Sequence, residues 1–162
     1  MTTTTTTTRT AFRIHAVAPD VLEQARGSGL DASGNPVAQV SAGGGEPLRC
    51  CLRDARPGEQ LMLFGYEPPI PPSPYREVGA IFAHAQPCEG HPDSAAYPQG
   101  WRGRPQVLRG YDARGWIHAA TVHDGQHPEA ALEELLADPE VVQVHSRNVA
   151  YGCYMFTVTR DL

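Results

Sequence analysis

Apolar and polar residues alternate along several short segments of the chain, which is the pattern of half-buried β-strands. At residues 12–17, Phe12, Ile14 and Ala16 alternate with Arg13 and His15. Turn-forming residues separate further extended segments and predict three hairpins, which join 48–53 to 60–66, 105–111 to 116–123, and 141–145 to 151–159. Residues 78–84 are also extended, and 37–40 give a weaker signal of the same kind.

Two segments have helical patterns instead. Residues 128–137 begin with Pro128, carry Glu129 in the first turn and place their leucines on one stripe, so we expect a well-formed helix there. A shorter helix is expected at 19–26. Five prolines within 67–74 exclude a helix or a central strand and predict a stiff connection. The predicted class is α+β, with a mostly antiparallel sheet of about six or seven strands, one good helix and one short helix.

The length of 162 residues suits a single domain, which we assign to residues 11–162. Residues 1–10 are threonine-rich and lack the apolar stretch of a secretory signal, so we expect a disordered tail. No run approaches the about 20 apolar residues of a membrane span. We therefore expect a cytoplasmic protein without membrane contacts, in which the four cysteines stay reduced.

Charge and composition narrow the chemistry further. The net charge of -5 argues against binding nucleic acid, which requires a basic face. All 13 basic residues are arginine, so there is no lysine for a pyridoxal phosphate Schiff base, and no nucleotide-binding motif is present. Because arginine keeps its proton, any proton transfer would use His, Cys, Tyr, Asp, Glu or water.

The most polar predicted hairpin turn lies at residues 145–153. In the preceding strand His145 alternates with Val144, and Arg147 continues the same polar face. If that face lines a cavity, His145 is placed for acid/base catalysis, and Arg147 and Asn148 for binding an anion. If it faces water, both charged groups are ordinary surface residues. Cys153 is either a nucleophile with His145 as its base, or a buried thiol of a central strand.

His84 and Cys88 offer a second kind of chemistry. Their spacing at the end of a predicted strand suits one soft cation, zinc or iron, with Cys153 and His145 as further ligands. The paired C-x-x-C motifs of common zinc sites are missing, and both residues also suit ordinary packing. Cys50 and Cys51 are adjacent in a predicted strand and are expected to point to opposite faces, so we assign them to packing.

Arginines next to apolar or aromatic residues are candidates for holding an anionic small molecule. They are Arg49, Arg76 and Arg109. Two of them converging without a carboxylate partner would form such a site, whereas pairing with neighbouring Asp or Glu would make them structural.

Several segments together resemble a bacterial family, the domain of unknown function 1203. They comprise 12–14, 49–55 with 57–59, 73–76 leading to 79–84, 108–112, and 145–148 with Gly152-Cys153. The resemblance extends over nearly all of the chain after Thr10, although Leu48 and Ala80 stand where the family often has Cys and Pro. It implies a single-domain bacterial protein without an established reaction. It also points to one set of positions as the first to test: Arg49, Ser73, Tyr75, Arg76, Tyr111, His145, Asn148 and Cys153.

The leading functional hypothesis from the sequence is an enzyme acting on a small anionic metabolite. Arg76 and Arg147 would bind the anion, His145 would act as general acid/base, and Tyr75 or Tyr111 would supply an orienting hydroxyl. The alternative is a non-catalytic binding module stabilised by a metal at the His/Cys site. A third hypothesis is an interaction domain that uses the proline run. The sequence leaves the choice between enzyme and binding protein open.

Overall fold

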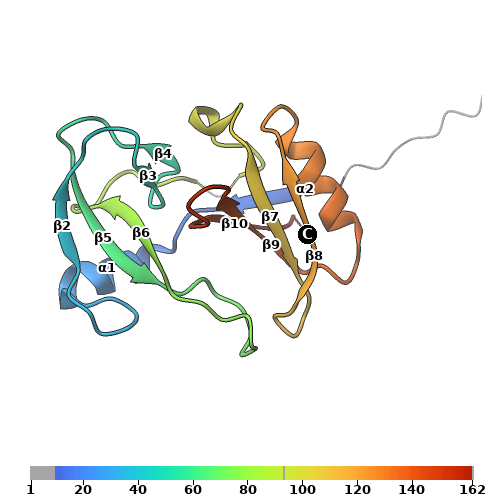
Figure 1. Ribbon diagram of the computed structural model, residues 1–162, viewed down its shortest axis with the longest axis horizontal. Coiled ribbons are helices and arrows are strands. Elements are labelled where there is room, and N and C mark those ends of the chain that lie inside the picture. The colour runs from blue at the N-terminus through green and yellow to red at the C-terminus, as the bar shows by residue number, and fades with distance from the viewer. Residues whose placement is uncertain (1–9, 93, 162) are drawn as a thin grey trace, which may run out of the picture.

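The computed structural model describes residues 10–92 and 94–161, so nearly all of the expected tail at 1–10 lies outside the described residues. The strands form two five-stranded sheets that lie side by side (Figure 1). The α+β class is confirmed, with mostly antiparallel pairing. The expected number of strands was too low, because the described residues contain ten strands and two of these have only two residues each.

The first sheet has the order β1-β10-β9-β7-β8 and is antiparallel throughout. Its strands are β1 (Phe12–His15), β10 (Tyr154–Arg160), β9 (Gln143–Asn148), β7 (Gln106–Tyr111) and β8 (Ile117–His123). The β7–β8 and β9–β10 hairpins were both predicted and are confirmed. Pairing of β1 with β10 brings the two ends of the described chain together.

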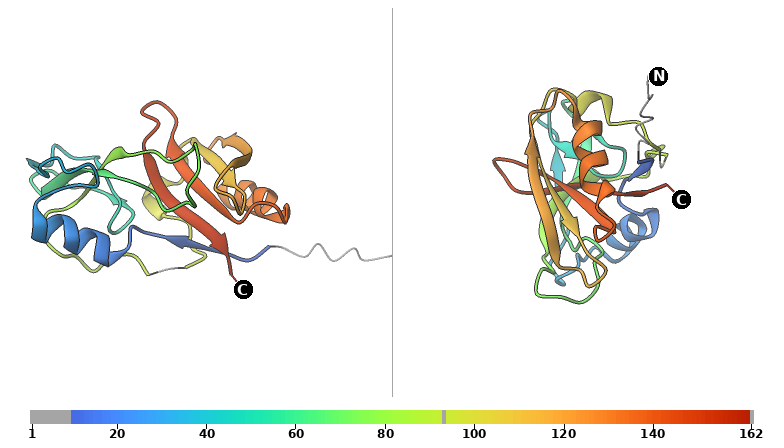
Figure 2. Two further views of the ribbon diagram at one scale, coloured as in Figure 1. Left: turned by 90° about the horizontal axis from the view of Figure 1, so that it is seen from below. Right: turned by 90° about the vertical axis from the view of Figure 1, so that its right-hand side faces the viewer.

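The helix α2 (Pro128–Ala137) has the predicted bounds and covers one side of the first sheet. Leu132, Leu135 and Leu136 are buried against strand residues such as Val144 and Phe156. Figure 2 shows α2 at one end of the molecule and α1 (Pro19–Ser28) at the other. A short 3-10 helix, Gln99–Trp101, buries Trp101 in the same core as α2.

The second sheet has the order β2-β5-β6-β3-β4. Its strands are β2 (Ala38–Ser41), β5 (Gln60–Tyr66), β6 (Gly79–His84), β3 (Pro47–Leu48) and β4 (Arg53–Asp54). β5 pairs with β2 and β6, so the predicted hairpin between 48–53 and 60–66 is wrong. Residues 49–52 instead form a turn closed by the Leu52 N–H donating to the Leu48 carbonyl at 2.9 Å. Both leucines are buried.

The two sheets have separate cores that meet at β10. Tyr154 packs with the second core, whereas Met155 and Phe156 pack with the first. A register shift between Tyr154 and Phe156 lets one strand serve both, because a bulge turns successive side chains to new directions. The proline-rich connection between β5 and β6 makes a further contact, in which Ser73 Oγ donates to the Gly115 carbonyl at 2.8 Å. Within the described part of the chain, no helix has the length and apolar character needed to cross a membrane.

Candidate metal centre

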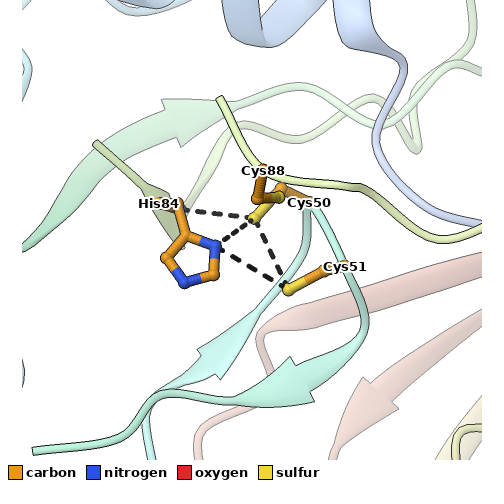
Figure 3. Close-up of side chains that lie close together, drawn as sticks. All are labelled: Cys50, Cys51, His84 and Cys88. Atoms are coloured by element: carbon orange, nitrogen blue, oxygen red, sulfur yellow. Dashed lines mark hydrogen bonds between the residues drawn. The ribbon is translucent and has the colours of Figure 1, made fainter. Parts of the chain in front are cut away.

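Four potential metal ligands meet beside the second sheet. Cys50 and Cys51 lie in the turn between β3 and β4, His84 is the last residue of β6, and Cys88 lies in the loop that follows. β3 pairs in parallel with β6, and the Arg49 N–H donates to the Phe82 carbonyl at 2.9 Å. This pairing places the cysteine turn next to the end of β6. Figure 3 shows the four side chains turned toward one another.

The distances in this cluster match those around a tetrahedral metal ion. The four ligand atoms all lie within 4.8 Å of one another. Cys50 Sγ is 3.8 Å from Cys51 Sγ, and His84 Nδ1 is 3.4 Å from Cys50 Sγ and 3.8 Å from Cys51 Sγ. Zinc bonds of about 2.3 Å to sulfur and about 2.0 Å to nitrogen imply S···S separations of about 3.8 Å and S···N separations of about 3.5 Å. Three of the four positions therefore already have the spacing of a zinc site.

The surroundings of Cys50 favour a thiolate. The backbone N–H of His84 donates to Cys50 Sγ at 3.3 Å. Hydrogen bonding to the neighbouring Cys51 thiol, and then to the His84 N–H, lowers the pKa of Cys50 to about 5 although burial opposes the shift. The same Cys50–Cys51 interaction, with burial, raises the pKa of Cys51. Adjacent thiols thus cannot both ionise readily without a cation between them.

The other ring nitrogen of His84 is held by a carboxylate. His84 Nε2 lies 2.7 Å from Glu59 Oε2, which leaves Nδ1 directed at the sulfur atoms. Glu59 is fixed in turn by a two-point contact with Arg53, at 2.8 and 2.9 Å, and by the Arg56 N–H. These donors hold the pKa of Glu59 well below its usual range, with Arg53 the largest cause. A carboxylate on the far nitrogen is the usual support of a metal-binding histidine, because it fixes the ring and its tautomer.

A pocket of about 780 Å³ adjoins the cluster. Cys50 and Cys88 both line it, together with residues of α1, the loop after Cys88, Tyr66 of β5 and Tyr154 of β10. Its volume falls within the range of small-molecule sites. The cluster is therefore reachable from one side without opening the second core.

In the polar hairpin predicted as an active site, the strand residues 145–147 are buried, whereas residues 149–152 of the turn are exposed. His145 is only 1% exposed and lies between the rings of Tyr111 and Tyr154, with centroids 4.6 and 5.5 Å away. Its Nε2 is 2.8 Å from Gln143 Oε1. Burial, and then the positive charges of Arg147 and Arg109, lower the pKa of His145 to about 3. His145 is therefore a neutral, enclosed imidazole whose Nδ1 is buried without a hydrogen-bond partner among the described residues.

The arginines of the same hypothesis are paired with carboxylates. Glu77 accepts from Arg109 at 2.6 Å and from Arg147 at 3.2 Å, and Arg147 also donates to the Gly152 carbonyl at 3.0 Å. Arg76 forms an exposed ion pair with Glu67. Arg147 and Cys153 line a pocket of about 160 Å³, and Arg76 is not among the residues that line it.

The remaining predicted site residues have structural contacts. Arg49 is buried and donates through Nε to the Tyr154 carbonyl at 2.7 Å, and burial lowers its pKa to about 10. Tyr75 packs edge-on against Trp116 beside the Ser73 contact. The Asn148 backbone closes the β9–β10 turn with Gly152 and Cys153. Cys153 Sγ lies near the Tyr151 carbonyl, at 3.7 Å, and is not part of the cysteine cluster.

Two residues of the cluster were assigned to packing on the basis of the sequence. Cys50 and Cys51 would point to opposite faces only in a strand, and the turn at 49–52 brings their sulfurs to the same side. Cys50 and Cys51 occupy the two ligand positions that the sequence hypothesis gave to His145 and Cys153. His84 and Cys88, which the sequence picked out for a metal, do lie together.

The fold and the cluster define an α+β protein with a half-buried group of three thiols and one imidazole. The family model described as "Protein of unknown function (DUF1203)" matches residues 45–160. The chain belongs to this family. Neither the curated proteins nor the solved structures contain a match to it.

Proposed function

We propose that this protein binds one soft divalent cation, zinc in preference to iron, through Cys50, Cys51, His84 and Cys88. The observation that carries the proposal is the convergence of four soft donors from three separate segments within 4.8 Å. Three thiolates and one neutral imidazole form a common ligand set for zinc. The support of His84 by Glu59 favours the same role.

A bound cation would also have a clear structural effect. The β3–β4 turn, the end of β6 and the loop carrying Cys88 share few hydrogen bonds, and the cation would tie them together. Because the unfolded chain holds no preformed site, the binding free energy would add to folding stability. An enzymatic role for the protein stays a hypothesis that depends on access to this centre.

Metal analysis of tag-free protein purified without oxygen tests the proposal. We expect one zinc per chain, or one cobalt after reconstitution, with thiolate-to-cobalt charge-transfer absorption in the near ultraviolet. Cys50→Ala, Cys51→Ala and His84→Ala should each abolish tight binding, and Cys153→Ala is the matched control that should keep it. A folded wild type that binds neither ion near stoichiometry would overturn the proposal. So would equal losses in Cys51→Ala and Cys153→Ala.

A further inference from the structure

The ligand Cys88 differs from the other three in how it is held. Cys50 and Cys51 belong to a turn closed by backbone hydrogen bonds, and His84 ends a paired strand. Cys88 lies in a loop outside the named helices and strands. The distances of 3.4 to 3.8 Å connect Cys50, Cys51 and His84, while Cys88 completes the group within 4.8 Å. The dashed lines in Figure 3 join Cys50, Cys51 and His84.

The pocket lies on the side of the cluster where Cys88 stands. Cys50 and Cys88 line it, and Cys51 and His84 do not. A molecule in the pocket would therefore approach the metal along the side closed by Cys88. Two cysteines and one histidine with a free fourth position form a donor set used by catalytic zinc sites, as opposed to closed structural ones.

The pocket wall has both apolar and charged parts. Leu22, Tyr66 and Tyr154 supply apolar surface, whereas Glu23 and Arg26 of α1 and Glu89 supply charge of both signs. Arg26 Nη2 donates to the carbonyls of His84 and Gln86, at 3.0 and 3.3 Å, which fixes its guanidinium close to the centre. Such a wall suits a small molecule with a short apolar body and a polar head group.

Resting on the proposed function, we infer that the centre takes a small organic thiol from this pocket in place of Cys88. The thiol would bind the metal as a thiolate, and its proton would pass to the Cys88 sulfur, so that one metal–sulfur bond forms as one breaks. This exchange leaves the charge of the half-buried centre unchanged, whereas water would remove a negative charge. A soft donor also matches the preference of a thiolate-bound cation.

Cobalt-substituted protein provides the test, with 2-mercaptoethanol as the first probe. In Cys88→Ala we expect cobalt to bind with about two-thirds of the wild-type charge-transfer intensity, because two of three thiolates remain. Adding 2-mercaptoethanol should restore the wild-type intensity and bring cobalt affinity to within about tenfold of wild type. Cys51→Ala should not be rescued in this way.

The pocket itself is tested by Ala18→Trp. Ala18 lines the pocket, is exposed and is not one of the four residues of the cluster. The larger ring should weaken 2-mercaptoethanol binding by about tenfold in the Cys88→Ala background and leave cobalt binding without thiol unchanged. Unchanged thiol affinity would show that the ligand does not enter through the pocket and would overturn the inference.

The failures of the two proposals are distinct. If wild type binds no metal, the proposed function fails and the exchange falls with it. If wild type binds cobalt but Cys88→Ala loses it as fully as Cys51→Ala, with no rescue by thiol, the centre is a closed structural site and only the exchange fails. Rescue by imidazole or acetate in place of 2-mercaptoethanol would overturn the thiol assignment alone.

Discussion

The two halves of the molecule use their polar side chains in opposite ways. In the half built on β1, β10, β9, β7 and β8, buried polar side chains bond to other side chains, as in the contacts of His145 Nε2 with Gln143 and of Arg147 with Glu77, although His145 Nδ1 and Arg147 Nε have no partner in the described part of the chain. In the half built on β2, β5, β6, β3 and β4, three thiols face one another and an imidazole. Thiolates so close together repel one another, and the neighbouring guanidinium of Arg53 is paired with Glu59.

This difference shows that a segment rich in polar residues is not necessarily one that can bind a ligand. A buried arginine or histidine that bonds to a carboxylate or an amide of the same chain stabilises its surroundings through that bond. A group of donors of one kind has capacity that only an external cation can use. The kind of donor that converges is thus more informative than the number of polar residues in a segment.

The largest expected effect is the difference in metal binding between substitutions of Cys51 and of Cys153, one thiol in each half. Cys51→Ala should abolish tight metal binding, whereas Cys153→Ala should leave the affinity unchanged. With free metal at a hundred times the dissociation constant, wild type should gain about 3 kcal/mol of unfolding free energy and Cys51→Ala almost none. Thermal unfolding with zinc and with a chelator measures both, and similar gains in the two variants would erase the contrast between the halves.

The next effect concerns the carboxylates that support each half. Glu59→Gln should lower metal affinity by about 10 to 100-fold, because the ring of His84 loses the charge that orients it. Glu77→Gln, the matched change in the other half, should leave metal affinity unaltered. Competition with a metallochromic chelator gives both affinities. Equal affinities for Glu59→Gln and wild type would mean that Glu59 only anchors Arg53.

Folding stability is expected to depend on pH through His145, which lies in the half without the cluster. Since the pKa of folded His145 is about 3 against an ordinary value of 6.5, the unfolded chain gains the proton first as the pH falls. The stability that depends on neutral His145 is complete above about pH 6.5 and is lost progressively toward pH 3. Between about pH 7.5 and pH 5 the loss should be about 2 kcal/mol.

Denaturant unfolding of His145→Gln over the same pH range checks this expectation. The variant should be less stable near neutrality, because Gln fills the space between Tyr111 and Tyr154 less well. Its stability should nevertheless fall less steeply toward pH 5 than that of wild type. Parallel slopes for the two proteins would assign the acid sensitivity to other groups.

The smallest expected effect is the stability change in Glu77→Gln. Glu77 is half exposed, but it serves Arg147, whose side chain is only 9% exposed. Removing the negative charge should cost about 1 kcal/mol, between the values for a surface pair and for a buried one. Urea unfolding measures the loss, and Glu67→Gln, which affects the exposed Arg76, is a control expected to cost less.

The sequence was most informative for elements that are long enough for a hydrophobic pattern to repeat. The helix at Pro128–Ala137 and the hairpins of the first sheet have enough residues for a pattern to repeat, and they were predicted correctly. β3 and β4 have two residues each, too few for any period to be visible. Their pairing depends on tertiary contacts, above all the parallel contact of Leu48 with Phe82.

The same limit explains the cysteine cluster. His84 and Cys88 are close in sequence, and their spacing at a strand end predicted a shared ligand. Cys50 and Cys51 join them only because the turn at 49–52 reverses the chain beside β6, which local propensity does not specify. The polar turn at 145–153 was predicted as an active site because its residue types resemble those of catalytic sites. The pairing of His145 with Gln143 and of Arg147 with Glu77 could not be predicted from the sequence.

The pairing of β1 with β10 fixes the order in which a ribosome completes the two halves. The first sheet closes only after Arg160 has been made and can pair with Phe12. The segments that carry Cys50, Cys51, His84 and Cys88 have all left the ribosome before β7 begins. Since domains form as their residues emerge, we expect the four donors of the cluster to meet before the first sheet is complete.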